Sequence, residues 1–313
     1  MQKLLTCLLF IMLTACAEGP KQTLQLAHQG LLSGALSRDG NLAVIGSVHH
    51  GGSLWDVDRK ERLYDWNHKS GEFSSIRATA ISGDSKAAVT CVGDNMVLWN
   101  VETGEYKQYW RAPDKILSIR LDETGDRALM GLENGTAAYF DMRNGSTIHI
   151  FNHDAEVGMV DIDAQGQFGI TGSEDKSAKI WNLRSGELVH SMTLNNFINT
   201  VAISPSGELA FVTSLREDAL VWDTQSGKVK FRFPNRYTNY HAAAFSEDER
   251  FLSVGTFQGE VKRFQISNGA EAGKWQAKPR QSYGAASSKA IIAIVDQGEG
   301  VTVLTSDGLM QRF

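Results

Sequence analysis

A short motif of an apolar or basic residue, an aromatic residue and a polar residue recurs along most of the chain and constrains the fold more than any other feature. Its aromatic residues are separated by 44, 41, 41, 41 and 42 positions. A glycine turn follows nearly every copy, and a second bulky apolar residue closes each unit. A fixed period of this length indicates repeated units that pack against their neighbours. The aromatic residues of the motif are Trp55, Trp99, Phe140, Trp181, Trp222 and, in a weaker copy, Phe264.

The alternation of apolar and polar residues within each repeat predicts four short strands. In the fifth repeat, apolar and polar residues alternate over residues 199–204, 208–213, 219–223 and 229–233. Serine, glycine, asparagine and aspartate separate these segments, as expected for half-buried strands joined by tight turns. The chain's 30 glycines and only 5 prolines agree with many such turns.

A four-stranded unit of 40 to 45 residues whose third strand ends in Trp-Asp resembles the WD-repeat family, whose units are the blades of a β-propeller. Six complete repeats are followed by a partial seventh with strands expected at 290–295, 301–305 and 309–313. The alternating segment 22–26 can supply its missing fourth strand. We therefore expect residues 22–313 to form an all-β, seven-bladed β-propeller of four-stranded antiparallel blades, the last of which is closed by the N-terminal strand.

The resemblance also implies a polar network that fastens each blade. In WD-repeat proteins, a histidine before the first strand, a hydroxyl on the second, an aspartate in the following turn and the tryptophan are joined by hydrogen bonds. The fourth blade matches this pattern best, with His153, Ser173 (or Thr171), Asp175 and Trp181. His153 and Asp175 could also be read as a catalytic pair, but the resemblance favours a structural role.

The first residues predict an export signal. A short basic start precedes an apolar run over residues 4–13, which is shorter than the roughly 20 residues that span a bilayer and typical of a signal peptide. The run ends in Leu13-Thr14-Ala15-Cys16, which resembles the lipobox of bacterial lipoprotein precursors. We therefore expect residues 1–15 to be a signal peptide.

The lipobox implies that Cys16 carries the lipid, including palmitate, and that residues 16–21 form a lipidated tether. Two or three acyl chains give stable membrane anchoring, unlike one. In the sorting rule of lipoproteins from enteric bacteria, an aspartate after the lipidated cysteine retains the protein at the inner membrane. The residue here is Ala17, so the resemblance implies the cell outer membrane, facing the periplasm. With Cys16 acylated and Cys7 removed, Cys91 remains alone and no intramolecular disulfide can form.

Neither catalysis nor nucleic-acid binding is indicated. The formal net charge is −5 and the basic residues are scattered, so no nucleic-acid surface is expected. The only close pair of histidines, His49-His50, has no third ligand at tetrahedral spacing, and we expect no metal, cofactor or catalytic residue. The sequence favours a monomeric, lipid-anchored protein-binding or scaffold module of the cell envelope. A propeller enzyme (a hydrolase or dehydrogenase) with a central-channel site and a soluble cytoplasmic scaffold are the alternatives.

In WD-repeat propellers, partners usually dock on the face formed by the loops between blades and the turns between the second and third strands, or at the mouth of the channel. Arginine and tyrosine are enriched among residues that dominate binding energy. The two tyrosines of the loop between blades five and six could instead only cover strand ends. The candidate partner-binding residues on this face are Arg216, Glu217, Arg236, Tyr237, Tyr240 and Phe257.

Overall fold

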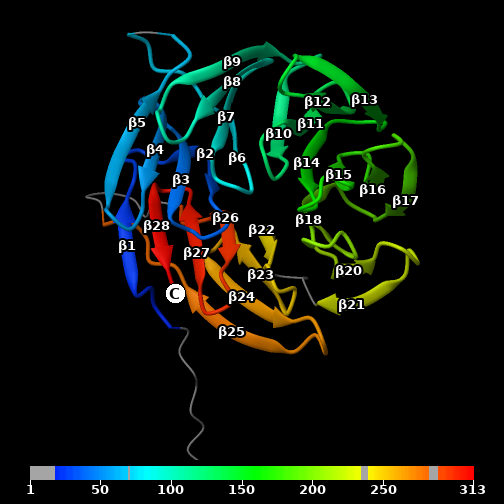
Figure 1. Cartoon of the computed structure of the whole chain (residues 1–313). Helices are drawn as coiled ribbons and strands as arrows, with labels where there is room; N and C mark the ends of the chain where they lie inside the picture. The colour runs from blue at the N-terminus through cyan, green and yellow to red at the C-terminus, as the bar shows by residue number, and fades with distance from the viewer. Residues whose placement is uncertain (1–17, 70, 234–238, 282–287) are drawn as a thin grey trace, which may run out of the picture.

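The computed structural model describes residues 18–69, 71–233, 239–281 and 288–313. Within these residues all regular secondary structure is β-strand, arranged in seven four-stranded antiparallel sheets around a central axis (Figure 1). Each sheet is one blade, with its first strand nearest the axis and its fourth strand at the circumference. The predicted seven-bladed propeller is confirmed.

Blades 1 to 6 are each continuous in sequence. Blade 1 contains β2 (Leu31–Leu36), β3 (Leu42–Ser47), β4 (Gly51–Asp56) and β5 (Glu61–Trp66). Blade 2 contains β6 (Ala78–Ile81), β7 (Ala87–Val92), β8 (Asn95–Asn100) and β9 (Tyr106–Arg111). Blade 3 contains β10 (Ile116–Leu121), β11 (Arg127–Leu132), β12 (Thr136–Asp141) and β13 (Ser146–Asn152).

The same order continues in the next three blades. Blade 4 contains β14 (Val157–Ile162), β15 (Phe168–Ser173), β16 (Ser177–Asn182) and β17 (Leu188–Thr193). Blade 5 contains β18 (Ile198–Ile203), β19 (Leu209–Ser214), β20 (Ala219–Asp223) and β21 (Val229–Phe233). Blade 6 contains β22 (Tyr240–Phe245), β23 (Phe251–Thr256), β24 (Glu260–Gln265) and β25 (Glu271–Gln276).

Blade 7 joins the two ends of the described chain. Its strands are β26 (Ile291–Asp296), β27 (Val301–Thr305), β28 (Leu309–Arg312) and the N-terminal β1 (Gln22–Gln25). β1 pairs antiparallel with β28, and Figure 1 shows the two strands side by side near the C-terminus. The expected closure is confirmed. It gives blade 7 its fourth strand, so that each of the seven blades has four strands.

The blades are held together mainly by apolar packing. The middle strands are almost completely buried, and all six residues of β19 are buried. The bulky residue that ends a fourth strand stacks on the motif aromatic residue of the next blade, which explains why both recur in the sequence. The pairs and their ring-centroid distances are Trp66–Trp99 (5.2 Å), Phe151–Trp181 (4.6 Å) and Phe233–Phe264 (4.2 Å).

One buried ion pair links blades 6 and 7. The guanidinium of Arg263 on β24 contacts both carboxylate oxygens of Asp296 at the end of β26, at 2.7 and 2.9 Å. The Asp296 side chain is fully buried and that of Arg263 is 9% exposed. The guanidinium also lies 3.7 Å from the ring centroid of Phe251, and it donates to the carbonyl of Gly298. Arg263 is the residue that precedes the weak sixth aromatic residue of the repeat.

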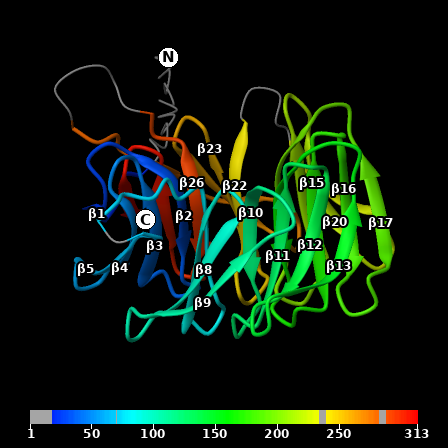
Figure 2. The ribbon, with the colours of Figure 1, turned by 90° about the horizontal axis from the view of Figure 1, so that it is seen from above.

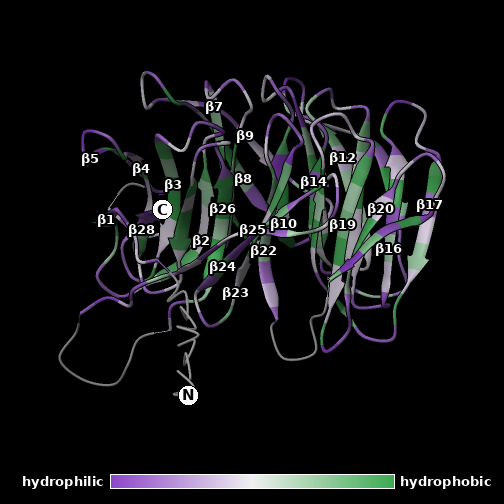
Figure 3. Ribbon diagram, turned by 90° about the horizontal axis from the view of Figure 1, so that it is seen from below, coloured by the Kyte–Doolittle hydropathy of each residue, from purple (hydrophilic) through white to green (hydrophobic). Residues whose placement is uncertain are grey.

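The ring has two faces formed by loops (Figure 2). On one face, here called the d–a face, the fourth strand of each blade leads to the next blade and the second strand turns into the third. The opposite face, the a–b face, carries the turns between the first and second and between the third and fourth strands. Figure 3 shows largely hydrophobic strands between largely hydrophilic loops.

Candidate functional site

The polar network of blade 4 is a continuous buried chain of hydrogen bonds. The indole N–H of Trp181 donates to the hydroxyl of Thr171 at 2.9 Å, and that oxygen lies 2.7 Å from Nε2 of His153. Nδ1 of His153 lies 2.8 Å from the carboxylate of Asp175. The hydroxyl between the rings is therefore that of Thr171 and not that of Ser173. Ser173 is the last residue of β15, too near the turn to lie between the rings, and it donates to a loop carbonyl instead.

The electrostatics of this network give a neutral histidine and an ionised aspartate. Burial lowers the pKa of His153 and outweighs the opposite effect of its hydrogen bond to Asp175. Burial disfavours the Asp175 carboxylate, but hydrogen bonds from Ser177, the Asp154 amide and His153 hold its pKa well below the usual range. The His153 side chain is completely buried. The pair therefore fastens the blade and is not presented to a substrate.

Blade 2 contains part of the same network, which the sequence reasoning missed. The indole N–H of Trp99 donates to the hydroxyl of Thr90 at 2.8 Å, and Nε2 of His68 lies 3.0 Å from that oxygen. His68 precedes Thr90 by 22 residues, whereas His153 precedes Thr171 by 18. The longer loop before blade 2 hides the correspondence in the sequence. The sequence signal for this network is a histidine before the first strand of the blade together with a threonine on the second strand.

On the d–a face, Glu217 ties two loops together. Its carboxylate accepts hydrogen bonds from the hydroxyl of Ser214 at 2.6 Å and from the amide of Asn195 at 3.1 Å. Asn196 adds a side-chain hydrogen bond to the carbonyl of Leu215 at 3.0 Å. Burial disfavours the Glu217 carboxylate, but these hydrogen bonds lower its pKa from the usual value. The loop between blades 4 and 5 and the turn between β19 and β20 are therefore held as one unit.

Three large apolar side chains are exposed on this part of the d–a face. They belong to Phe197 (51% exposed), Leu215 (40%) and Phe257 (56%), and we call them the apolar patch. Phe197 and Leu215 extend from the two loops that Glu217 joins, and Phe257 lies in the corresponding turn of the neighbouring blade 6. Arg216 is exposed beside Leu215 in a turn with φ of 62°. Phe257 and Arg216 are two of the candidates that the sequence predicted.

The remaining candidates are not all brought to this surface. Tyr240 is 1% exposed and packs edge-on against Phe211 of blade 5, so its selection as a partner-binding residue was wrong. It begins β22, where the first strand of blade 6 packs against blade 5, and this position makes it part of the core. Arg236, Tyr237 and Cys16 lie outside the described residues.

The first strands of all seven blades line a central channel with a volume of about 460 Å³. Its wall combines small and aliphatic residues with charged ones, and the Arg120 guanidinium contacts Asp161 at 3.2 Å between blades 3 and 4. At the a–b mouth, Arg38 reaches from blade 1 to Glu123 of blade 3 at 2.8 Å and to Glu247 of blade 6 at 3.5 Å. Ion pairs therefore cross this mouth of the channel.

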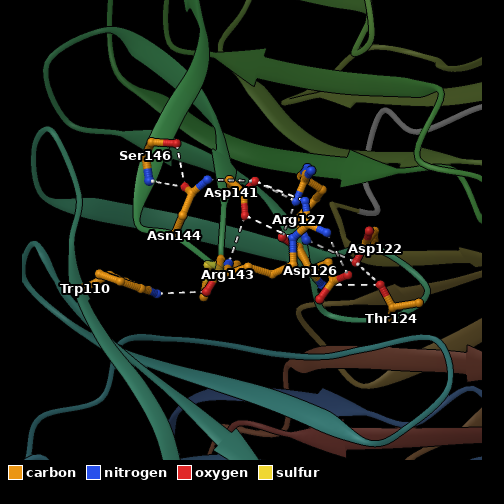
Figure 4. Close-up of polar contacts among 10 residues, drawn as sticks. Trp110, Asp122, Thr124, Asp126, Arg127, Asp141, Arg143, Asn144 and Ser146 are labelled. Carbon is orange, nitrogen blue, oxygen red and sulfur yellow. Dashed lines mark hydrogen bonds and ion pairs between the residues drawn. The ribbon is translucent and has the colours of Figure 1, made fainter.

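The acidic residue of the blade 3 motif is also engaged by neighbouring side chains, as Figure 4 shows. Asp141 contacts Arg127 at 3.0 Å and Arg143 at 3.4 Å, and it accepts a hydrogen bond from the Arg143 amide at 2.9 Å. Burial alone would raise the pKa of Asp141, but the hydrogen bonds from Arg143 and the charge of Arg127 lower it. This carboxylate stabilises the turn at the end of β12 and is not free to act as a base.

Asp163, in the turn after β14, gives a pH-dependent contribution to stability. It is 2% exposed, its Oδ1 accepts the Gln167 amide at 2.7 Å, and its buried Oδ2 has no hydrogen-bond partner among the described residues. Burial raises its pKa to about 6, above the value of about 3.9 expected in the unfolded chain. Because the folded state binds this proton more tightly than the unfolded chain does, the free energy of unfolding falls as the pH rises. The loss is about 2 kcal/mol between about pH 4 and pH 6.

We therefore expect Asp163→Asn, which keeps the acceptor for Gln167, to be more stable than the wild type at pH 7.5 and equal to it near pH 4. Urea unfolding of both proteins at a series of pH values measures this difference. Burial also raises the pKa of the neighbouring Asp161. This carboxyl titrates in both proteins, so its effect cancels in the stability difference between them. A stability difference that does not change with pH would contradict the assignment.

Among the described residues, no group of three or more histidine, cysteine, aspartate or glutamate side chains is placed to hold a metal ion. The described part of the chain also contains no helix of the length and apolarity needed to cross a membrane.

Comparison with known proteins agrees with the fold. A β-propeller family described as "Nucleolar protein 10-like, N-terminal domain" matches residues 82–222, from the turn after β6 to β20. Angio-associated migratory cell proteins of Homo sapiens, Pongo abelii and Canis lupus familiaris are each 27% identical over 117 residues, which is 36% of this chain. The match covers only 25% of the length of those relatives. The chain is a seven-bladed β-propeller, and its repeated motif is similar to that of WD-repeat proteins.

Proposed function

We propose that this protein is an exported lipoprotein, anchored in the outer membrane through Cys16, that binds a protein partner in the periplasm through the d–a face of blades 5 and 6. The observation that carries the binding role is the apolar patch, in which Phe197 and Leu215 extend from the two loops that Glu217 joins. The lipobox Leu13-Thr14-Ala15-Cys16 carries the anchor.

The geometry of the patch suits protein binding for two reasons. Aromatic side chains are enriched in protein interfaces, where they bury a large area. The hydrogen bonds of Glu217 also fix the surrounding backbone before binding, so less conformational entropy is lost on association. Arg216 adds an exposed cation at the rim, where charge contributes mainly to the rate and specificity of association.

The polar groups of the molecule favour binding over catalysis. The buried His153–Asp175 pair, the arginine-bound Asp141 and the ion pairs of Arg38 across the channel mouth all serve the fold. A scaffold role also agrees with the β-propeller similarity.

Photo-crosslinking in cells tests the proposed face. A photoreactive amino acid at Phe197 or at Phe257 is expected to give the same discrete protein adduct, because both side chains extend from one binding surface. Leu188 and Tyr109 are matched controls, since they are exposed to a similar extent (48% and 54%) but lie on the outer strands β17 and β9. A binding site on this face would be refuted if neither patch position gave an adduct. It would also be refuted if the control positions gave the same adduct as the patch positions.

A further inference from the structure

The segment that follows the expected anchor is docked on the fold. The carbonyl of Glu18 accepts a hydrogen bond from the amide of Gln276 at 3.1 Å, and Glu18 forms a parallel bridge with Trp275 at the edge of blade 6. Three residues later, the amide of Lys21 donates to the carbonyl of Arg312 at 2.8 Å. Residues 18–21 therefore run along the outer edge of blades 6 and 7 and do not form a free tether.

Only Ala17 separates Cys16 from this docked segment. Consecutive Cα atoms are about 3.8 Å apart, so two such steps limit the reach of the chain between Glu18 and the expected lipidation site to about 7.6 Å. A flexible linker of about 20 residues would span roughly 25 Å and let the propeller rotate freely. An acyl group on Cys16 must instead enter the bilayer next to the edge between blades 6 and 7.

Two exposed cations lie at the same edge. Lys21 follows the docked segment, and the side chain of Lys278 reaches over Gly19, with its Cε 3.2 Å from the ideal Cβ position of that glycine. Neither lysine forms an ion pair with a carboxylate in the described part of the chain, which contains every aspartate and glutamate of the sequence. Such lysines are attracted to an anionic lipid surface at close range.

Building on the proposed lipid anchor, we propose that the propeller lies edge-on against the membrane, with the edge of blades 6 and 7 on anionic phospholipid headgroups. Lys21 and Lys278 contact the headgroup phosphates. Blade 3 points away from the membrane, because β12 and β13 lie across the ring from β1 and β25 (Figure 1). Both loop faces are then roughly perpendicular to the membrane plane, and the apolar patch remains accessible to a partner.

Energy transfer to labelled lipid headgroups tests this orientation. The full lipidated protein is placed in vesicles of phosphatidylethanolamine and phosphatidylglycerol, with a donor dye on Ala272→Cys in β25 or on Thr147→Cys in β13. Both positions are exposed, and the native Cys91 is buried and does not compete for the dye. Transfer is expected to be several-fold stronger from position 272 than from position 147.

Two further variants separate the contributions of the short link and of the charges. A Gly-Ser linker of about 20 residues inserted between Ala17 and Glu18 should make transfer from the two positions nearly equal. Lys21→Gln with Lys278→Gln should reduce the difference, whereas the control Lys107→Gln with Lys228→Gln, on β9 and before β21, should leave it unchanged.

Equal transfer from the two positions of the acylated protein would overturn the edge-on orientation and leave the anchor intact. An unchanged difference in the Lys21 and Lys278 variant would overturn the headgroup contact. Protein that does not float with the vesicles and carries no acyl group on Cys16 would overturn the anchor itself, and the orientation with it.

Discussion

Replacing Asp296 with alanine is expected to lower the free energy of unfolding by about 3–5 kcal/mol, because the buried guanidinium of Arg263 is left without its counter-ion. The same change removes the acceptor of the Ser253 hydroxyl and of the Gly298 amide. Since Asp296 and Arg263 join blades 6 and 7, the loss weakens the closure of the ring. Urea unfolding followed by tryptophan fluorescence measures it.

The paired variant Arg263→Leu with Asp296→Leu is the control for this interpretation. It removes both charges together, so neither is left buried and unpaired, and we expect a much smaller loss than for Asp296→Ala. If the single and the paired variants are equally unstable, packing and not the uncompensated charge determines the effect.

Replacing Thr171 with valine is expected to cost about 2–4 kcal/mol, although the two side chains have nearly the same shape. The change leaves the buried indole N–H of Trp181 and Nε2 of His153 without hydrogen-bond partners. Thr90→Val in blade 2 should cause a similar loss, since it deprives Trp99 and His68 of the same contact. Chemical unfolding of each variant provides the measurement.

Thr23→Val, on the exposed side of β1, serves as the reference and should change stability by less than about 0.5 kcal/mol. If Thr171→Val is as harmless as Thr23→Val, the hydrogen-bonded chain contributes nothing measurable to blade 4. In that case the arrangement that blades 2 and 4 share would reflect packing of the rings alone.

The strands could be predicted from the sequence because the repeat places the same pattern of apolar residues at a nearly constant interval. The segments 219–223 and 229–233 coincide with β20 and β21. The closure of blade 7 by β1 followed from counting the missing strand. These features depend on period and alternation, which a single sequence displays directly.

The site was less predictable because burial and hydrogen bonding depend on how loops pack. Thr171 and Ser173 face the same side of β15, so the strand pattern does not distinguish them. Only the position of each hydroxyl along the strand, relative to the indole of Trp181, decides which one forms the hydrogen bond. Tyr240 could be a loop residue or the start of a strand, and only the packing against Phe211 places it in the core. The role of Glu217 required knowing that the loop at Asn195 lies beside its turn.

The docking of Glu18 was also not predictable, because the segment between the lipobox and the first strand has no repeat partner to compare. Sequence alone suggested a tether over residues 16–21. In the structure, residues 18–21 lie along the ring, which leaves a link of one residue. If Cys16 carries the proposed lipid, this short link constrains the position of the propeller on the membrane.

The most direct test of the proposed membrane-anchored binding protein is metabolic labelling with radioactive palmitate, comparing the wild type with Cys16→Ala. We predict that the wild type incorporates label and gains the mass of its acyl chains on a mature chain beginning at Cys16. The Cys16→Ala protein should carry no label and should leave the membrane fraction. An unlabelled wild-type protein that retains residues 1–15 and stays in the soluble fraction would contradict the account.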